Sequence, residues 1–165
     1  MTRDEFIKVL KDKGYEYELE GDKIVVTRKG GVWLESLTSL PPDVVFNNWG
    51  FVYLRSLTSL PPDVEFKNGG DVGLESLTSL PPDVVFRNRE SVWLESLTSL
   101  PPGVEFRNGG DVHLWKLKTL PPGVKFKNGG KVYLGSLIGG WIDDWSGNIE
   151  GIDLLNVMIK REMFI

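Results

Sequence analysis

The chain of 165 residues contains no cysteine and only one histidine, His113. The lack of cysteine excludes disulfide bonds and thiolate metal sites, and it leaves the redox compartment open. No apolar stretch approaches the ~20 residues that a membrane-spanning helix needs. Residues 1–6 carry charges where the apolar run of a signal peptide would begin. We therefore expect a cytoplasmic protein without a membrane partner.

The chain also lacks an excess of basic residues and any catalytic constellation. Its net charge is −4 and its pI is about 5.1, which disfavours nucleic acid as a partner. No nucleophile lies near His113 in the sequence or in the repeat, and the glycine pairs lack the lysine and helix of a phosphate loop. We expect no catalytic residue, no metal site and no cofactor, and hence a protein that is not an enzyme.

What the sequence does contain is a repeat of twenty residues. The segment Leu34–Val44, with the sequence LESLTSLPPDV, returns four times. The copies are residues 54–64, 74–84, 94–104 and, with more variation, 114–124. A fixed period of this size is typical of a solenoid, in which each coil buries its apolar face against its neighbours.

Apolar residues keep fixed positions within the coil. When Val32 is taken as position one, positions one, three, thirteen and fifteen are Val, Leu, Val and Phe. This alternation predicts two short strands per coil, near residues 32–34 and 44–46 and their equivalents, with these side chains pointing inward. Pro-Pro and Asn-x-Gly segments form the corners. The sequence therefore predicts a mainly β, single-domain, parallel β-solenoid.

Two of the inward positions, filled by phenylalanine and by asparagine, lead to specific predictions. Phe66, Phe86 and Phe106 should be buried and stacked on one another. At position seventeen the coils carry asparagine. These residues are Asn48, Asn68, Asn88, Asn108 and Asn128. We interpret them as an amide ladder that satisfies backbone groups of the turns and joins successive coils, with a ligand site as the alternative.

The N-terminal residues predict a cap for the first coil. Residues 2–5 form a capping box, and an apolar stripe follows until Gly14 ends the helix. A hairpin around Gly21 comes next, and Ile24 already falls in the strand register of a preceding half coil. We assign residues 1–27 to an N-terminal helix-hairpin cap, because the end of a solenoid exposes open strand edges.

The C-terminal residues predict a second cap. We assign residues 28–137 to the solenoid and 138–165 to a C-terminal cap with a helix at Leu154–Met163. In the register of the repeat, Asn148 falls at position seventeen of the last coil, and Ile152 begins a further one.

The Leu-Thr-Ser-Leu-Pro-Pro element resembles short bacterial leucine-rich repeats, although their usual L-x-x-L-x-L-x-x-N-x-L spacing is absent. The chain is more similar to uncharacterised repeat proteins of bacteria and their phages. Three features carry this likeness: Met1–Thr27, the V-x-L-x-S-L-T-S-L-P-P coil, and the ending Gly139–Trp141 followed by Asn148–Ile152. The resemblance implies a β-solenoid from a mobile element, and it implies no active-site residues. It also suggests a phage-encoded inhibitor of a host defence system, acting in the host cell.

Large aromatic side chains occupy outward positions of the first strand. The residues are Trp33, Phe51, Tyr53, Trp93, His113 and Trp115, with Trp49 at the rim. One interpretation is cross-strand stacking, worth roughly 0.2–1 kcal/mol per pair, with His113 as a surface stacking residue. The other is an interaction surface for a protein partner or for a second copy in a homodimer. Trp49 replaces a glycine without an evident core reason, so we favour binding, with a purely structural or self-associating role as the alternative.

The outward positions of the second strand carry a basic column. Its members are Lys67, Arg87, Arg107 and Lys127. Glu65 and Glu105 lie two positions before basic residues and are placed to bridge them. We expect a solvated lattice of salt bridges, with an anion-binding strip as the alternative.

Overall fold

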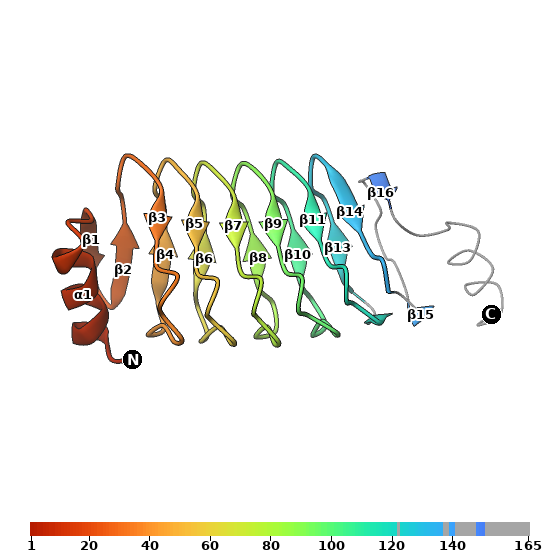
Figure 1. Ribbon diagram of the computed structural model, residues 1–165, viewed down its shortest axis with the longest axis horizontal. Coiled ribbons are helices and arrows are strands. Elements are labelled where there is room, and N and C mark those ends of the chain that lie inside the picture. The colour runs from red at the N-terminus through yellow and green to blue at the C-terminus, as the bar shows by residue number, and fades with distance from the viewer. Residues whose placement is uncertain (122, 137–138, 141–147, 151–165) are drawn as a thin grey trace.

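The structure is a computed structural model, and it describes residues 1–121, 123–136, 139–140 and 148–150. Over these residues the chain is mainly β, with one short helix, α1 (Arg3–Asp12), at its N-terminal end. Successive coils follow one another along the long axis of the molecule (Figure 1). Two sheets of parallel strands run along this axis, joined coil by coil. The predicted parallel β-solenoid is therefore confirmed.

Each repeat contributes one strand to each of two sheets. The first sheet contains β3 (Val32–Trp33), β5 (Val52–Tyr53), β7 (Val72–Gly73), β9 (Val92–Trp93), β11 (Val112–His113) and β14 (Lys131–Tyr133). The second sheet contains β4 (Val44–Phe46), β6 (Glu65–Phe66), β8 (Val85–Phe86), β10 (Glu105–Phe106) and β13 (Lys125–Phe126). Partners in both ladders are twenty residues apart, as in the pairs Val52↔Val72 and Phe86↔Phe106. The two strands per coil match the expectation from the alternating columns.

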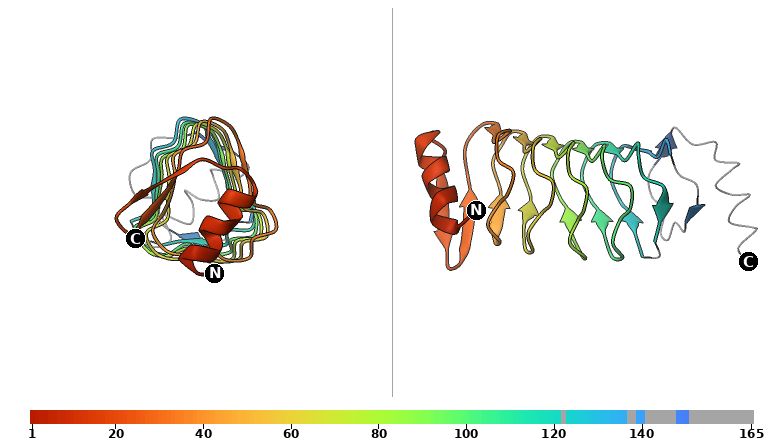
Figure 2. Two further views of the ribbon diagram at one scale, coloured as in Figure 1. Left: turned by 90° about the vertical axis from the view of Figure 1, so that its left-hand side faces the viewer. Right: turned by 60° about the horizontal axis from the view of Figure 1, so that its bottom comes forward.

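A third, shorter ladder gives the coils a three-sided outline (Figure 2, left). β12 (Thr119–Leu120) pairs in parallel with β15 (Gly139–Gly140), and Ser59 bridges Ser79 at the same corner. The residue after each Pro-Pro pair has a positive φ. These residues are Asp43, Asp63, Asp83, Gly103 and Gly123. Aspartate tolerates this left-handed backbone better than most residues, so three coils carry aspartate here and the next two carry glycine.

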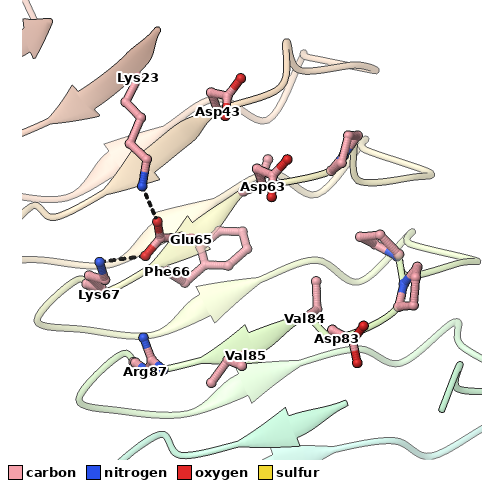
Figure 3. Close-up of a pocket in the computed structure, with 14 residues that line it drawn as sticks. Lys23, Asp43, Asp63, Glu65, Phe66, Lys67, Asp83, Val84, Val85 and Arg87 are labelled. Atoms are coloured by element: carbon pink, nitrogen blue, oxygen red, sulfur yellow. Dashed lines mark hydrogen bonds and ion pairs between the residues drawn. The ribbon is translucent and has the colours of Figure 1, made fainter. Parts of the chain in front are cut away.

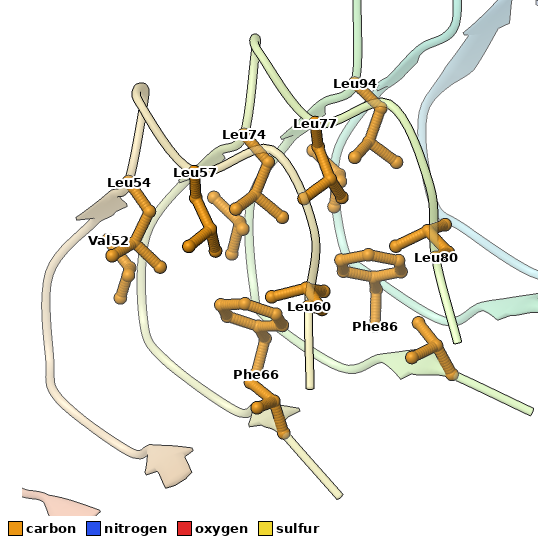
Figure 4. Packing of buried hydrophobic residues seen from close by; sticks show 14 of the residues in the cluster. Val52, Leu54, Leu57, Leu60, Phe66, Leu74, Leu77, Leu80, Phe86 and Leu94 are labelled. Carbon is orange, nitrogen blue, oxygen red and sulfur yellow. The ribbon is translucent and has the colours of Figure 1, made fainter. Parts of the chain in front are cut away.

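The inward columns form one continuous apolar core. Phe46, Phe66, Phe86, Phe106 and Phe126 are at most 1% exposed. Their rings stack with centroids 5.2–5.6 Å apart. Leucines of the corner pack beside them, as Figure 4 shows for Leu60 next to Phe66 and Leu80 next to Phe86. The predicted burial and stacking of the phenylalanines is confirmed.

The asparagine column joins the coils as predicted. The Asn68 side-chain amide Nδ2 donates to the carbonyl of Gly50 in the preceding coil at 3.1 Å. It also donates to the carbonyls of Gly70 and Asp71 in its own turn, at 2.9 and 3.2 Å. The same pattern recurs at the other four asparagines. Because each buried amide nitrogen donates to carbonyls of its own coil and of the preceding one, the column joins successive coils.

The N-terminal helix forms with the predicted capping box. The backbone N–H of Glu5 donates to Thr2 Oγ1 at 3.2 Å, and the backbone N–H of Thr2 donates to Glu5 Oε2 at 2.7 Å. The hydrogen bond from the Thr2 backbone lowers the pKa of Glu5. Phe6 and Leu10 are fully buried in the core. α1 is neither long nor apolar enough to cross a membrane, and it is the only helix in the described residues.

The hairpin after the helix continues the second sheet. β1 (Tyr17–Glu20) pairs antiparallel with β2 (Lys23–Val26). β2 then pairs in parallel with β4, with Ile24 opposite Val44 and Val26 opposite Phe46. The half coil expected at Ile24 is therefore present.

The last coil departs from the predicted register. β16 (Asn148–Glu150) pairs with β14, and Asn148 lies opposite Lys131, an offset of seventeen residues instead of twenty. Leu120 and Gly140 still keep the offset of twenty. The segment between Gly140 and Asn148 is thus three residues too short for a full coil, so placing Asn148 at position seventeen was wrong. The predicted C-terminal helix at 154–163 lies outside the described residues.

Candidate functional site

The first aromatic group on the outer face of the first sheet consists of Trp33, Phe51 and Tyr53, the N-terminal aromatic cluster. Strand alternation turns Trp33 and Tyr53 outward, since their neighbours Val32 and Val52 are fully buried. The Trp33 and Phe51 rings meet edge to face at a centroid distance of 4.4 Å, and Phe51 stacks on Tyr53 at 4.4 Å. Trp33 remains 47% exposed, so part of this apolar surface faces solvent.

Charged side chains border this cluster. The guanidinium of Arg55 lies 4.6 Å from the centroid of the Tyr53 ring. The same group forms ion pairs with Glu35 at 3.4 Å and Glu75 at 2.9 Å. Burial raises the pKa of the Tyr53 hydroxyl, so it is neutral at physiological pH. The cluster therefore has an apolar centre and a polar edge, as protein interfaces do.

A second group, the C-terminal aromatic cluster, lies farther along the same sheet. It consists of Trp93, His113, Trp115 and Tyr133. His113 stacks between Trp93 at 3.7 Å and Tyr133 at 4.7 Å, and Trp115 contacts Tyr133 at 4.9 Å. Trp115 is 39% exposed. The stacking expected for the aromatic column is present in both clusters.

Gly73 separates the two clusters. A Cβ atom on Gly73 would lie 2.8 Å from Cδ1 of Tyr53, so the tyrosine ring covers this glycine. Gly73 itself is buried. The aromatic surface predicted from the column is therefore divided into two clusters.

His113 is a correction to the sequence prediction. We expected a surface stacking residue, but the side chain is only 8% exposed. Burial lowers the pKa of His113, although Asp111 and Glu95 oppose this effect. The aromatic rings above and below cover its faces, which the sequence position alone did not reveal. His113 therefore supports the C-terminal aromatic cluster from beneath, and Trp115 is the most exposed member of that cluster.

Trp49 is a second correction. It is 71% exposed, and within the described part of the chain no ring contact joins it to Trp33 or Phe51. It lies in the turn after β4, where the Lys29 ammonium is 6.0 Å from the centroid of its ring. It also lines a hollow together with Lys67 and Arg89, on the side of the second sheet. Strand alternation does not determine side-chain direction in a turn, so the sequence register misplaced it.

The basic column on the second sheet largely forms the predicted salt-bridge lattice. Glu65 bridges Lys23 at 2.7 Å and Lys67 at 2.5 Å (Figure 3). Hydrogen bonds from these two lysines hold the pKa of Glu65 below its usual value. Glu105 pairs with Arg107 at 2.8 Å and with Lys127 at 3.6 Å. The pKa of Glu105 is lowered in the same way, chiefly by the hydrogen bond from Arg107.

Arg87 is the exception in this column. It follows Val85 instead of a glutamate, and it has no carboxylate partner among the described residues. It lines a hollow of about 480 Å³ with Lys67 and Glu65 on one side and Asp63 and Asp83 on the other (Figure 3). Three of the four residues of the predicted anion strip are thus ion-paired, with each glutamate shared between two basic side chains.

Within the described residues, no group of three or more histidine or carboxylate side chains is placed to hold a metal ion. Comparison of the chain with protein-family models, with curated proteins and with solved structures gave no match. The functional conclusions therefore rest on the surfaces themselves.

Sequence reasoning left three residues out of the candidate surfaces. Tyr133 and Arg55 belong to the aromatic clusters, and Arg89 lines the hollow beside Trp49. The signal was present, because Tyr133 shares the column of Trp33 and Arg89 shares the turn position of Trp49. Reading each column to its end would have included them.

Proposed function

We propose that this protein is a non-enzymatic binding module that docks a protein partner through the two aromatic clusters of the first sheet. The observation that carries the proposal is the exposure of Trp33 and Trp115, at 47% and 39%, on a sheet whose inward valines and leucines are already fully buried. Folding does not require large aromatics at these outward positions. Tryptophan, tyrosine and arginine are the residues most often found at the energetic centres of interfaces.

The charges around the clusters favour a partner with a basic rim. The outward positions beside the aromatics carry five acidic and two basic side chains. The acidic ones are Glu35, Asp71, Glu75, Glu95 and Asp111, and the basic ones are Arg55 and Lys131. A two-fold dimer through this face would place the acidic rims against each other, so a foreign protein fits better than a second copy. Each Å² of apolar surface covered contributes about 25 cal/mol before association costs.

The test is the double substitution Trp33→Ser with Tyr53→Ser. We expect it to abolish binding of the partner captured from the cell of origin, measured with the purified partner by calorimetry, while the circular dichroism spectrum stays unchanged. Leu19→Ser is the matched control, because Leu19 is 52% exposed on β1, outside both clusters. It should leave the affinity intact.

Light scattering on the same proteins separates the alternatives. A homodimer that the double substitution dissociates would identify the partner as a second copy and support the self-associating role. Undiminished binding and an unchanged oligomeric state would refute the proposal that the aromatic clusters bind the partner, and the basic column would then be the candidate surface.

Two further proposals concern the N-terminal end of the solenoid and the location of the protein in the cell. We propose that α1 and the β1–β2 hairpin cap the first coil, supported by the full burial of Phe6 and Leu10 and by the pairing of β2 with β4. A cytoplasmic location and a phage or prophage origin follow the resemblance of the coil, and an inhibitor of a host defence system is the specific form of the same binding role.

A further inference from the structure

The turn position that follows each asparagine contains one unusual succession of residues. In successive coils it reads Trp49, Gly69, Arg89, Gly109 and Gly129. The backbone N–H of Gly69 donates to the carbonyl of Asn48, and that of Arg89 donates to the carbonyl of Asn68, so the three turns are stacked directly. Gly69 therefore leaves a gap between the side chains of Trp49 and Arg89.

The gap is a hollow of about 500 Å³. Its lining consists of Asn47, Asn48, Trp49, Lys67, Gly69 and Arg89. Two coil spacings of about 4.8 Å separate the backbones of Trp49 and Arg89 by roughly 9–10 Å. A planar ring that contacts an indole on one face and a guanidinium on the other requires these two planes to be about 7 Å apart. The slot is thus wide enough for a single planar ring.

The charges at the slot favour an anion. Arg89 is exposed and has no carboxylate partner among the described residues. Lys67 shares Glu65 with Lys23, so this group of three side chains keeps one net positive charge. The adjacent Glu90 is exposed and does not line the hollow. Although the whole chain has a net charge of −4, this part of its surface is positive.

We propose that the slot binds a small anion that carries a planar ring, of the type of a nucleoside monophosphate. The ring stacks between Trp49 and the Arg89 guanidinium, above the backbone of Gly69. The phosphate lies against the ammonium of Lys67 and the guanidinium of Arg89. Stacking on tryptophan and arginine together with cationic contacts to phosphate is a general mode of binding ring-bearing phosphates. The slot lies in the turns that follow the strands of the second sheet and includes no residue of the aromatic clusters, so the proposal does not depend on them.

The experiment is titration of the full chain with AMP, followed by tryptophan fluorescence and calorimetry. Adenosine and inorganic phosphate serve as probes for the two halves of the ligand. We expect AMP to bind more tightly than either half. Trp49→Gly should weaken AMP and adenosine by about fivefold or more, and Arg89→Gly should weaken AMP and phosphate similarly. Both variants introduce the residue that other coils carry at this position, so the fold should be retained.

Trp33→Ser is the control, because it removes an exposed tryptophan from the other sheet. It should not change AMP binding. Equal affinity for AMP and phosphate, or unchanged AMP affinity in Trp49→Gly, would overturn the proposal. An oligodeoxyadenylate that binds more tightly than AMP, and loses affinity in both variants, would identify single-stranded nucleic acid as the source of the ring. Binding of AMP alone would identify a free nucleotide.

Discussion

The phenylalanine ladder provides the sharpest test of the fold. Phe86 is fully buried, with Phe66 at 5.6 Å on one side and Phe106 at 5.3 Å on the other. Phe86→Ala removes the ring from the middle of this stack. The neighbouring coils cannot move together to close the cavity, because backbone hydrogen bonds of the second sheet fix their spacing. The Arg87 N–H donates to the Phe66 carbonyl, and the Arg107 N–H donates to the Phe86 carbonyl. We therefore expect a loss of about 3–5 kcal/mol in the free energy of unfolding.

Urea unfolding followed by far-ultraviolet circular dichroism measures this loss. For a domain of this size each kcal/mol lowers Tm by about 2–4 °C, so the melting temperature should fall by roughly 6–20 °C. Phe51→Ala is the matched control, since Phe51 is only partly buried and its ring contacts are those of the outer face. That variant should lose only about 0.4–2 kcal/mol, given its two ring contacts, one with Trp33 on the preceding strand of the sheet and one with Tyr53 two residues along the chain. If Phe86→Ala is no less stable than Phe51→Ala, the inward ladder does not hold the coils together.

Two further predictions concern the cap and the histidine. Deletion of residues 1–27 should expose the edge of β4 and cause association, seen as larger species in size-exclusion chromatography; a soluble monomer with an unchanged spectrum would contradict the cap. Because burial lowers the pKa of His113, the unfolded chain binds this proton at higher pH than the folded chain, and stability should fall on acidification through and below about pH 6.5. Tyrosine stands at the equivalent position of the next coil, so His113→Tyr should reduce the loss of stability at low pH, measured by urea unfolding at several pH values. An unchanged pH dependence would show that His113 is not the group responsible.

The core was predictable because the repeat fixes it many times over. A one-residue error in register would have moved every phenylalanine to the outer face, so the same position filled by phenylalanine in five coils agrees with only one parity. The asparagine ladder followed from the same logic, since a buried amide needs partners and the turn carbonyls are the nearest ones. These predictions concern positions whose surroundings are identical in each coil.

The errors occurred where the surroundings change. The position of Asn148 depends on the length of the segment after Gly140, which does not repeat, so the register could not be extended through it. The burial of His113 depends on Trp93 and Tyr133, whose large rings cover it from both sides. Trp49 lies in a turn, where no alternation assigns a direction. In each case the placement of the residue depends on a neighbouring side chain or on the length of a local segment, and not on its position in the repeat.

The turn position of Trp49 shows why departures from the repeat are informative. A Cβ atom at Gly69, Gly109 or Gly129 would lie 2.0–2.4 Å from a carbonyl oxygen of the preceding coil, so glycine is the residue that the stacked turns favour. Trp49 and Arg89 occupy this position although stacking does not require their side chains. If they are present for binding, Trp49→Gly and Arg89→Gly should keep the full stability of the solenoid while they weaken AMP. Stability lost in parallel with affinity would mean that the two side chains support the turns, and the slot would then be a by-product of packing.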